Sequence, residues 1–258
     1  MDYKEILYAL EDDLAIVTLN RPSKMNALTG QMRAEITHAM KRAASEARAV
    51  VLTGAGAAFC SGQDLSDASG NGDLDMERTL RDEYTPMLEA IYDCPVPTLS
   101  VINGPVAGAG ANLALAADVV IATESAYFLQ AFARIGLMPD AGGTWFLPRQ
   151  MGLAKAMGAA LFADKISAKQ ASDWGMIWEA IPDDEFDATW RARAAYLAKG
   201  PTKAFGAIKT AIRASYGNSL PEQLSVEASL QGECGKSRDF NEGVTAFLEK
   251  RPANFEGR

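Results

Sequence analysis

The chain has 258 residues, of which 48% are hydrophobic and 22% charged, a composition typical of a globular protein with a full core. Its formal net charge of −8 argues against nucleic acid or an anionic membrane surface as the main partner. An acidic chain can still hold a local basic pocket, so a phosphorylated small ligand remains open.

The N-terminal segment and the cysteines indicate a cytoplasmic protein. Residues 1–13, MDYKEILYALEDD, are charged and lack the apolar centre of a signal peptide. No apolar run reaches the roughly 18 residues that a membrane-spanning helix requires. Cys60, Cys94 and Cys234 are odd in number and far apart, which fits reduced thiols better than a disulfide framework. We therefore predict a cytoplasmic location and no membrane partner.

Apolar runs and amphipathic periods predict strands early in the chain and only helices near its end. Thr29 is a suitable N-cap for a helix that buries Met32, Ile36 and Met40. The acidic segment 66–75 is predicted to be a mobile surface loop. Strands are expected at residues 6–10, 14–19, 50–53, 98–102 and 177–181, and helices at 76–92, 153–162, 168–176, 186–198, 202–216, 221–232 and 239–249.

A stretch at the centre of the chain, residues 101–144, contains two glycine-rich turns. The first follows a β-branched run and carries Gly104, Gly108 and Gly110 ahead of an alanine-rich helical segment. The second is Pro139-Asp140-Ala141-Gly142-Gly143. A turn that opens a helix leaves backbone N–H groups unpaired and directed at whatever lies in front of them. We predict that the two turns form two walls of one site.

Several common kinds of site are excluded by the residues present. Phe59 replaces the last glycine of a dinucleotide fingerprint over residues 54–59, and Leu230 replaces the first glycine of a P-loop that would end at Ser237. His38 is the only histidine and is expected on a solvated helix face. A Ser-His-Asp triad, a Cys-His pair or a zinc site therefore cannot be assembled, so catalysis must use carboxylates, backbone N–H groups or water.

Asp140 is the best single candidate for a catalytic side chain. Apolar residues, including Leu137 and Trp145, surround it in the sequence. Such surroundings disfavour a charged carboxylate and can raise its pKa into a useful range for an acid or base. The alternative is a helix N-cap that accepts a hydrogen bond from the N–H of Gly142 or Gly143. From these residues alone the capping role is favoured, and both remain open.

Four ordered motifs resemble the crotonase (enoyl-CoA hydratase/isomerase) superfamily over nearly the whole chain. They lie at residues 20–28, 52–65, 101–110 and 237–251. The resemblance implies an α/β fold, a spiral of repeated ββα units, with a C-terminal helical region that builds homotrimers, often paired into hexamers. We accordingly assign residues 1–198 to the α/β core and 199–258 to the helical oligomerisation region. It further implies an acyl-CoA thioester substrate, no cofactor besides its coenzyme A, and no metal.

The resemblance also implies which residues form the site. By motif position, the main-chain N–H groups of Gln63 and Ala109 would form an oxyanion hole, and two such donors can hold a thioester oxygen as it becomes an enolate. A Lys often stands in the family where this chain has Ser66. The residues implied to bind coenzyme A are Lys24, Ala27, Gln63, Asp64, Leu65, Ser66 and Ala109.

The reaction is indicated by departures from the hydratase pattern. The two glutamates of the hydratases match Asn112 and Phe132 here, and neither can transfer a proton. Asp140 matches a functional aspartate of dienoyl-CoA isomerases and of aryl dehalogenases, but the dehalogenases also need a histidine and a tryptophan that are missing from the matching positions. We therefore predict an isomerase with Asp140 as its acid and base.

The subgroup with the greatest resemblance converts ring-1,2-epoxyphenylacetyl-CoA to oxepin-CoA in phenylacetate catabolism and can also convert cis-3 to trans-2 enoyl-CoA. Two alternatives remain open at this point. One is an enoyl-CoA hydratase that uses a single carboxylate, and the other is a non-catalytic acyl-CoA-binding protein.

Overall fold

The computed structural model describes residues 2–66 and 75–258, so most of the predicted loop at 66–75 lies outside the described residues. The strands are β1 (Ile6–Glu11), β2 (Leu14–Leu19), β3 (Ala49–Gly54), β4 (Thr98–Ile102), β5 (Val106–Ala107), β6 (Val119–Thr123), β7 (Tyr127–Leu129), β8 (Ile166–Ser167) and β9 (Glu179–Ile181). The α-helices are α1 (Gly30–Glu46), α2 (Met76–Thr79), α3 (Thr85–Tyr92), α4 (Ala109–Leu115), α5 (Gly143–Phe162), α6 (Ala168–Asp173), α7 (Phe186–Lys199), α8 (Thr202–Ala214), α9 (Leu220–Cys234) and α10 (Arg238–Glu249). Short turns of other helix types are η1 (Pro22–Lys24), η2 (Leu80–Tyr84) and η3 (Ala131–Ile135).

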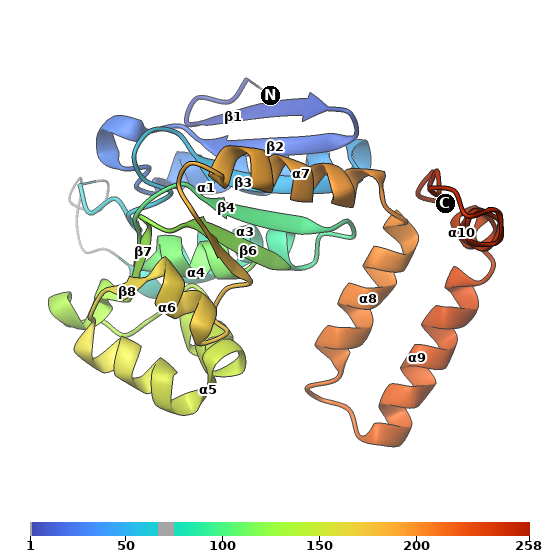
Figure 1. Cartoon of the computed structure of the whole chain (residues 1–258). Coiled ribbons are helices and arrows are strands. Elements are labelled where there is room, and N and C mark those ends of the chain that lie inside the picture. Colours follow the sequence, from blue (N-terminus) through green and yellow to red (C-terminus); the bar gives the residue numbers. More distant parts are fainter. Residues whose placement is uncertain (1, 67–74) are drawn as a thin grey trace.

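Six strands in the described part of the chain form one sheet in the order β1-β2-β3-β4-β6-β9, and β5, β7 and β8 form a second, smaller sheet. In the larger sheet β1 and β2 are an antiparallel hairpin, and every later strand is added parallel to its neighbour. The central parallel strands β3 and β4 are almost wholly buried because helices cover both of their faces (Figure 1).

Successive residues of β3 show the two faces. Val50 and Leu52 belong to the large core that includes residues of α1, α3, α4 and α5, whereas Val51 belongs to a smaller core completed by Phe186 and Trp190 of α7. The period of two along a strand therefore divides the side chains between two helical layers. The predicted cap also forms: Thr29 accepts a hydrogen bond from the N–H of Met32 at 3.0 Å.

The structure corrects several predicted bounds. The helix predicted at 153–162 forms as the second segment of α5, and the structure adds a first segment from Gly143 that was not predicted; Gly152, with φ 78° and ψ 161°, separates the two. Glycine can adopt this conformation because it has no Cβ atom, and the chain changes direction here between the two segments. The helix predicted at 168–176 ends at Asp173, and the strand predicted at 177–181 spans only β9. The helix predicted at 76–92 contains the π-helical turn η2.

The three C-terminal helices extend away from the sheets, and α8 and α9 lie side by side (Figure 1). The C-terminal half of α8 is bound to the core through Asp118: one carboxylate oxygen lies 2.7 Å from Lys209 Nζ, and the other lies 2.7 Å from Arg213 Nη2. Within the described residues, no helix is long and apolar enough to cross a membrane.

Candidate functional site

Three segments from distant parts of the sequence run side by side at one edge of the fold. Leu28 forms a parallel bridge with Gln63, and Cys60 forms another with Val106. The bridges are closed by hydrogen bonds from Leu28 N–H to the Gly62 carbonyl at 2.7 Å and from Ala107 N–H to the Cys60 carbonyl at 2.9 Å. The loops that contain residues 24–28, 60–66 and 106–109 therefore form one continuous surface.

The main-chain N–H groups of Gln63 and Ala109 belong to adjacent loops on this surface. A Cβ atom added to Gly62, whose φ is 95°, would lie 3.4 Å from the nitrogen of Ala109 and 3.0 Å from the Ala107 carbonyl oxygen. Only glycine allows the two loops to approach so closely. In the described part of the chain, neither the Gln63 N–H nor the Ala109 N–H has a hydrogen-bond acceptor. Both donors are therefore available to a ligand oxygen.

Asp140 is held beside α5 without capping it. Gly142, with φ 82°, is the N-cap of α5 and makes no side-chain cap, while the N–H of Gly143 donates to the main-chain carbonyl of Asp140 at 2.8 Å. The Oδ1 atom of Asp140 is buried and accepts no hydrogen bond from the described residues. Burial raises the pKa of Asp140 from its usual 3.8 to about 6, although a contact with its own N–H opposes the rise. The capping role that the sequence favoured is therefore wrong.

The position that matches one hydratase glutamate has a structural task in this chain. The fully buried Asn112 donates from Nδ2 to the Asp140 carbonyl at 2.7 Å and accepts at Oδ1 from Nε2 of Gln130 at 2.9 Å. A Cβ atom on Gly143 would lie 2.4 Å from that Nδ2. Phe132, at the other position, is buried and apolar. Asn112 thus anchors the Asp140 turn, and among these matched positions only Asp140 carries an acid.

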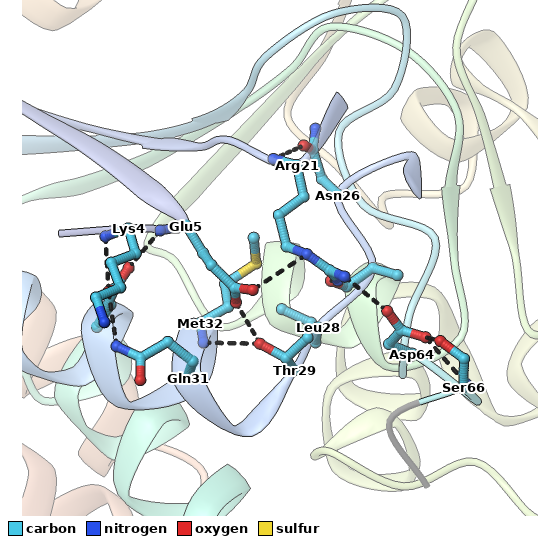
Figure 2. A network of polar contacts seen from close by, with 12 residues as sticks. Lys4, Glu5, Arg21, Asn26, Leu28, Thr29, Gln31, Met32, Asp64 and Ser66 are labelled. Atoms are coloured by element: carbon cyan, nitrogen blue, oxygen red, sulfur yellow. Dashed lines mark hydrogen bonds and ion pairs between the residues drawn. The ribbon is translucent and has the colours of Figure 1, made fainter. Parts of the chain in front are cut away.

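The residues expected to bind coenzyme A lie around a charged network (Figure 2). Arg21 bridges Asp64, with Nη2 to Oδ2 at 2.9 Å, and Glu5, with Nε to Oε1 at 3.3 Å. Ser66 donates to Asp64 Oδ1 from Oγ at 2.6 Å and from its N–H at 3.0 Å. The Ser66 hydroxyl, assisted by Arg21 and opposed by desolvation, lowers the pKa of Asp64 to about 2. The Asp64 carboxylate therefore holds its own loop in place.

The other expected contact residues occupy both sides of this network. Lys24 and Leu65 are exposed, whereas Ala27 is buried and its carbonyl accepts from Arg21 Nη1 at 2.5 Å. The structure thus brings Lys24, Ala27 and residues 63–66 to one edge of the fold, and Lys24 is the cation of this group that projects into solvent.

Sequence reasoning missed Arg33, Tyr84 and Gln130, all of which are buried and polar near this edge. A signal for Arg33 was available, because it shares the apolar face of α1 with Ile36 and Met40 at helical spacing. His38 is exposed as expected, and its Nδ1 lies 2.9 Å from the hydroxyl oxygen of Tyr3.

The fold and the paired N–H turns define an acyl-CoA enzyme of the crotonase type, and comparisons with known proteins agree. The model of the enoyl-CoA hydratase/isomerase family matches residues 10–258, so the chain belongs to the crotonase (enoyl-CoA hydratase/isomerase) superfamily. The chain is 62% identical to a "Probable enoyl-CoA hydratase" of Rhodobacter capsulatus, with 100% of both chains covered. It is 42% identical to the 1,2-epoxyphenylacetyl-CoA isomerase of Escherichia coli over 98% of each. An enoyl-CoA hydratase structure from Bacillus anthracis, 28% identical, superposes with a TM-score of 0.91 over 99% of this chain and 100% of that one.

The family assignment settles the general class of the protein. It is an enzyme of the hydratase/isomerase family. Enzymes of this family act on acyl-CoA thioesters and need no cofactor besides the coenzyme A of the substrate. The described residues include no group of three or more His, Cys, Asp or Glu side chains placed to hold a metal ion.

Proposed function

We propose that this protein is an acyl-CoA isomerase in which Asp140 moves a proton through a thioester enolate. The observation that carries the proposal is the buried Oδ1 of Asp140, which has no partner among the described residues. A native protein rarely leaves such an acceptor unpaired unless it has a use. With a pKa near 6, the carboxylate is ionised at neutral pH and still basic enough to remove a proton.

The chemistry follows from the groups present. For a cis-3 enoyl-CoA, the Asp140 carboxylate removes a proton from C2, and the electrons move onto the thioester oxygen while the N–H groups of Gln63 and Ala109 bind it. The protonated Asp140 then returns the proton to C4, and the double bond lies between C2 and C3. No atom is gained or lost. A matched ring substrate, 1,2-epoxyphenylacetyl-CoA, carries the same acidic position next to the thioester, and the 42% identity to an isomerase named for it supports this substrate in phenylacetate catabolism.

The second candidate is hydration by Asp140 with one ordered water. The relative with 62% identity, named as a probable hydratase, favours it. Asn112 and Phe132 weigh against it, because Asn112 uses both ends of its amide in hydrogen bonds and Phe132 has no proton to give. A hydratase with one carboxylate would have to use the same group to activate water and to protonate C2.

A substrate panel in D2O tests the two candidates together. The enzyme is mixed with a cis-3 enoyl-CoA, with 1,2-epoxyphenylacetyl-CoA and with crotonyl-CoA, and the products are read by mass spectrometry. We expect isomers that have gained no water, with deuterium in the product wherever the proton on Asp140 exchanges with solvent before it is returned. Water addition to crotonyl-CoA that outpaces every isomerisation would establish the hydratase instead. Tight binding with no isomer, no hydrated product and no deuterium uptake would mean a non-catalytic acyl-CoA-binding protein.

We also propose that α8, α9 and α10 assemble the chain into a homotrimer or a hexamer of paired trimers. These helices expose large apolar side chains, including Ile212 at 62% and Phe247 at 83% of their surface, and enclose a groove of about 780 Å³ lined by residues such as Leu230 and Val244. Apolar patches of this extent mark contact surfaces. Light scattering of the purified protein should give three or six times the chain mass, and a monomer would refute the assembly. A cytoplasmic location stays a prediction from the sequence.

A further inference from the structure

Arg33 is a buried cation on α1 that the proposed proton transfer does not use. Only 3% of its surface is exposed, and its Nε and Nη2 atoms lie 3.1 and 2.5 Å from Oε2 of Glu83. The remaining nitrogen, Nη1, donates to Oε1 of Gln63 at 2.6 Å. Burying a charge costs free energy unless it is paired, so this placement requires both partners.

A second donor fixes the same side-chain oxygen of Gln63. The hydroxyl of Tyr84 donates to Oε1 at 2.6 Å, and its ring lies under the Arg33 guanidinium, 4.7 Å from carbon to ring centre. Burial raises the pKa of Tyr84, so its hydroxyl stays protonated and keeps donating. Two donors from different elements converge on one amide oxygen, which restricts the Gln63 side chain to a single orientation.

Arg33 also holds the main chain on the opposite side of Gln63. Its Nη1 lies 3.3 Å from the carbonyl oxygen of Leu28, the same oxygen that accepts from Asp64 N–H at 2.9 Å. Leu28 in turn donates to the Gly62 carbonyl at 2.7 Å. Gly62 and Asp64, the two residues that flank Gln63, are therefore both hydrogen-bonded to Leu28, which Arg33 also contacts.

The π-helical turn η2 supplies both Glu83 and Tyr84 to this cluster. In this turn of i→i+5 hydrogen bonds the neighbouring Glu83 and Tyr84 contact Arg33 and Gln63, and Thr85 Oγ1 donates to the Leu80 carbonyl at 3.0 Å. Single π-turns inside α-helices occur often at functional sites.

We propose that Arg33, with Tyr84, is a positioning residue that fixes the side chain of Gln63 and thereby aims the Gln63 N–H at the thioester oxygen. The proposal rests on the proposed function, because it assigns the Gln63 N–H to the oxyanion. Arg33 itself touches no substrate. It acts by removing the freedom of the loop that carries the donor, so its effect belongs to the transition state, where the oxygen becomes negative.

Three variants of the full-length enzyme test the kinetic consequence. Arg33→Lys keeps the charge but loses the fork, Tyr84→Phe removes only the hydroxyl, and Gln63→Met keeps the side-chain length without the acceptor. Each should lower kcat about 10- to 100-fold and change KM less than about threefold, because misplacing a donor weakens the transition state more than substrate binding. In the double variant Arg33→Lys with Gln63→Met, the Arg33 substitution should cost much less than it does alone, because only its contact with the Leu28 carbonyl is left to lose.

A spectroscopic measurement separates positioning from a purely structural role. Butyryl-CoA with a ¹³C-labelled thioester carbonyl has no double bond to move, and hydrogen bonds to its oxygen lower the carbonyl stretching frequency. The shift seen with the wild-type enzyme should be reduced in Arg33→Lys and unchanged in Arg48→Lys. Arg48 is a matched control at the far end of α1, where it bonds the Gly200 carbonyl at 2.6 Å and the Phe255 carbonyl at 3.1 Å.

The possible outcomes distinguish this inference from the proposed function. An Arg33→Lys enzyme with a lower Tm but an unchanged carbonyl shift and kcat would overturn the positioning role, as would additive effects in the double variant. An Asp140→Asn enzyme that keeps both the carbonyl shift and full isomerase activity would refute the proton transfer and leave the positioning role standing. Absence of any shift in the wild-type enzyme would overturn both.

Discussion

The sharpest prediction concerns the Asp140→Asn variant, which should be inactive and more stable than the parent at neutral pH. The carboxyl has a folded-state pKa of about 6 against its ordinary 3.8. The folded state therefore holds a proton that the unfolded state has released, so stability falls as pH rises from 3.8 through 6. A pKa difference of about 2 corresponds to about 3 kcal/mol, which partial exposure of the side chain reduces to about 1–3 kcal/mol.

Asparagine carries no charge and removes this dependence. We expect the free energy of unfolding of the variant, measured in urea at one protein concentration, to exceed that of wild type by about 1–3 kcal/mol near pH 8. The gap should shrink as pH falls through 6 towards 4. Isomerase turnover should fall by about 10²- to 10⁴-fold near pH 8, and the wild-type kcat/KM should rise with pH through 6 as the base ionises.

Asp64→Asn is the matched control, because the pKa of Asp64 is lowered to about 2 rather than raised. Its stabilising effect is present above the unfolded-state pKa and is lost only as pH falls towards 2. This variant should therefore be less stable than wild type by a nearly constant amount across the same pH range. A pH-independent gap for Asp140→Asn, or near wild-type turnover, would refute the reasoning about Asp140.

Two further predictions concern the surroundings of the site. Gly143→Ala places a Cβ atom 2.4 Å from Nδ2 of Asn112, so we expect the variant to be destabilised by about 1–3 kcal/mol in urea unfolding and to lose most of its isomerase turnover. Wild-type stability and turnover would contradict the close approach of these two residues. Asp118→Ala leaves the half-buried Lys209 and Arg213 without their shared carboxylate, so the free energy of unfolding should fall by about 3 kcal/mol and amide hydrogen exchange in α8 should become faster. Unchanged exchange in α8 would show that these ion pairs do not hold the helix against the core.

Local signals predicted the elements well, and tertiary contacts explain what they missed. The Thr29 cap and the hairpin at the N-terminus depend on residues close in sequence, so their patterns sufficed. The capping role of Asp140 was wrong because Gly142, in the left-handed conformation, is the N-cap and the helix begins two residues later than a capping aspartate requires. The helix predicted at 153–162 forms, but the helical segment that precedes Gly152 was not predicted.

The polar contacts around the site could not be predicted from the residues alone. Gln130 reaches Asn112 across 18 positions, and Arg33 reaches Gln63 across 30, so their proximity depends on how the sheets fold. Resemblance to the family located Gln63 and Ala109 by their motifs. It implied nothing about the hydrogen bonds from Arg33 and Tyr84 to the Gln63 side chain. The bare N–H groups themselves depend on Gly62, whose positive φ permits the two loops to meet.

The amide of Asn112 makes a carboxylate hard to accommodate at this position. A glutamate at this position would place a carboxylate against the main-chain carbonyl of Asp140, and two acceptors would face each other where a donor and an acceptor now bond at 2.7 Å. The longer side chain would also meet the backbone at Gly143, which already lies against Asn112. We therefore expect that Asn112→Glu alone does not install two-acid hydration, because the Asp140 turn would first have to be rebuilt.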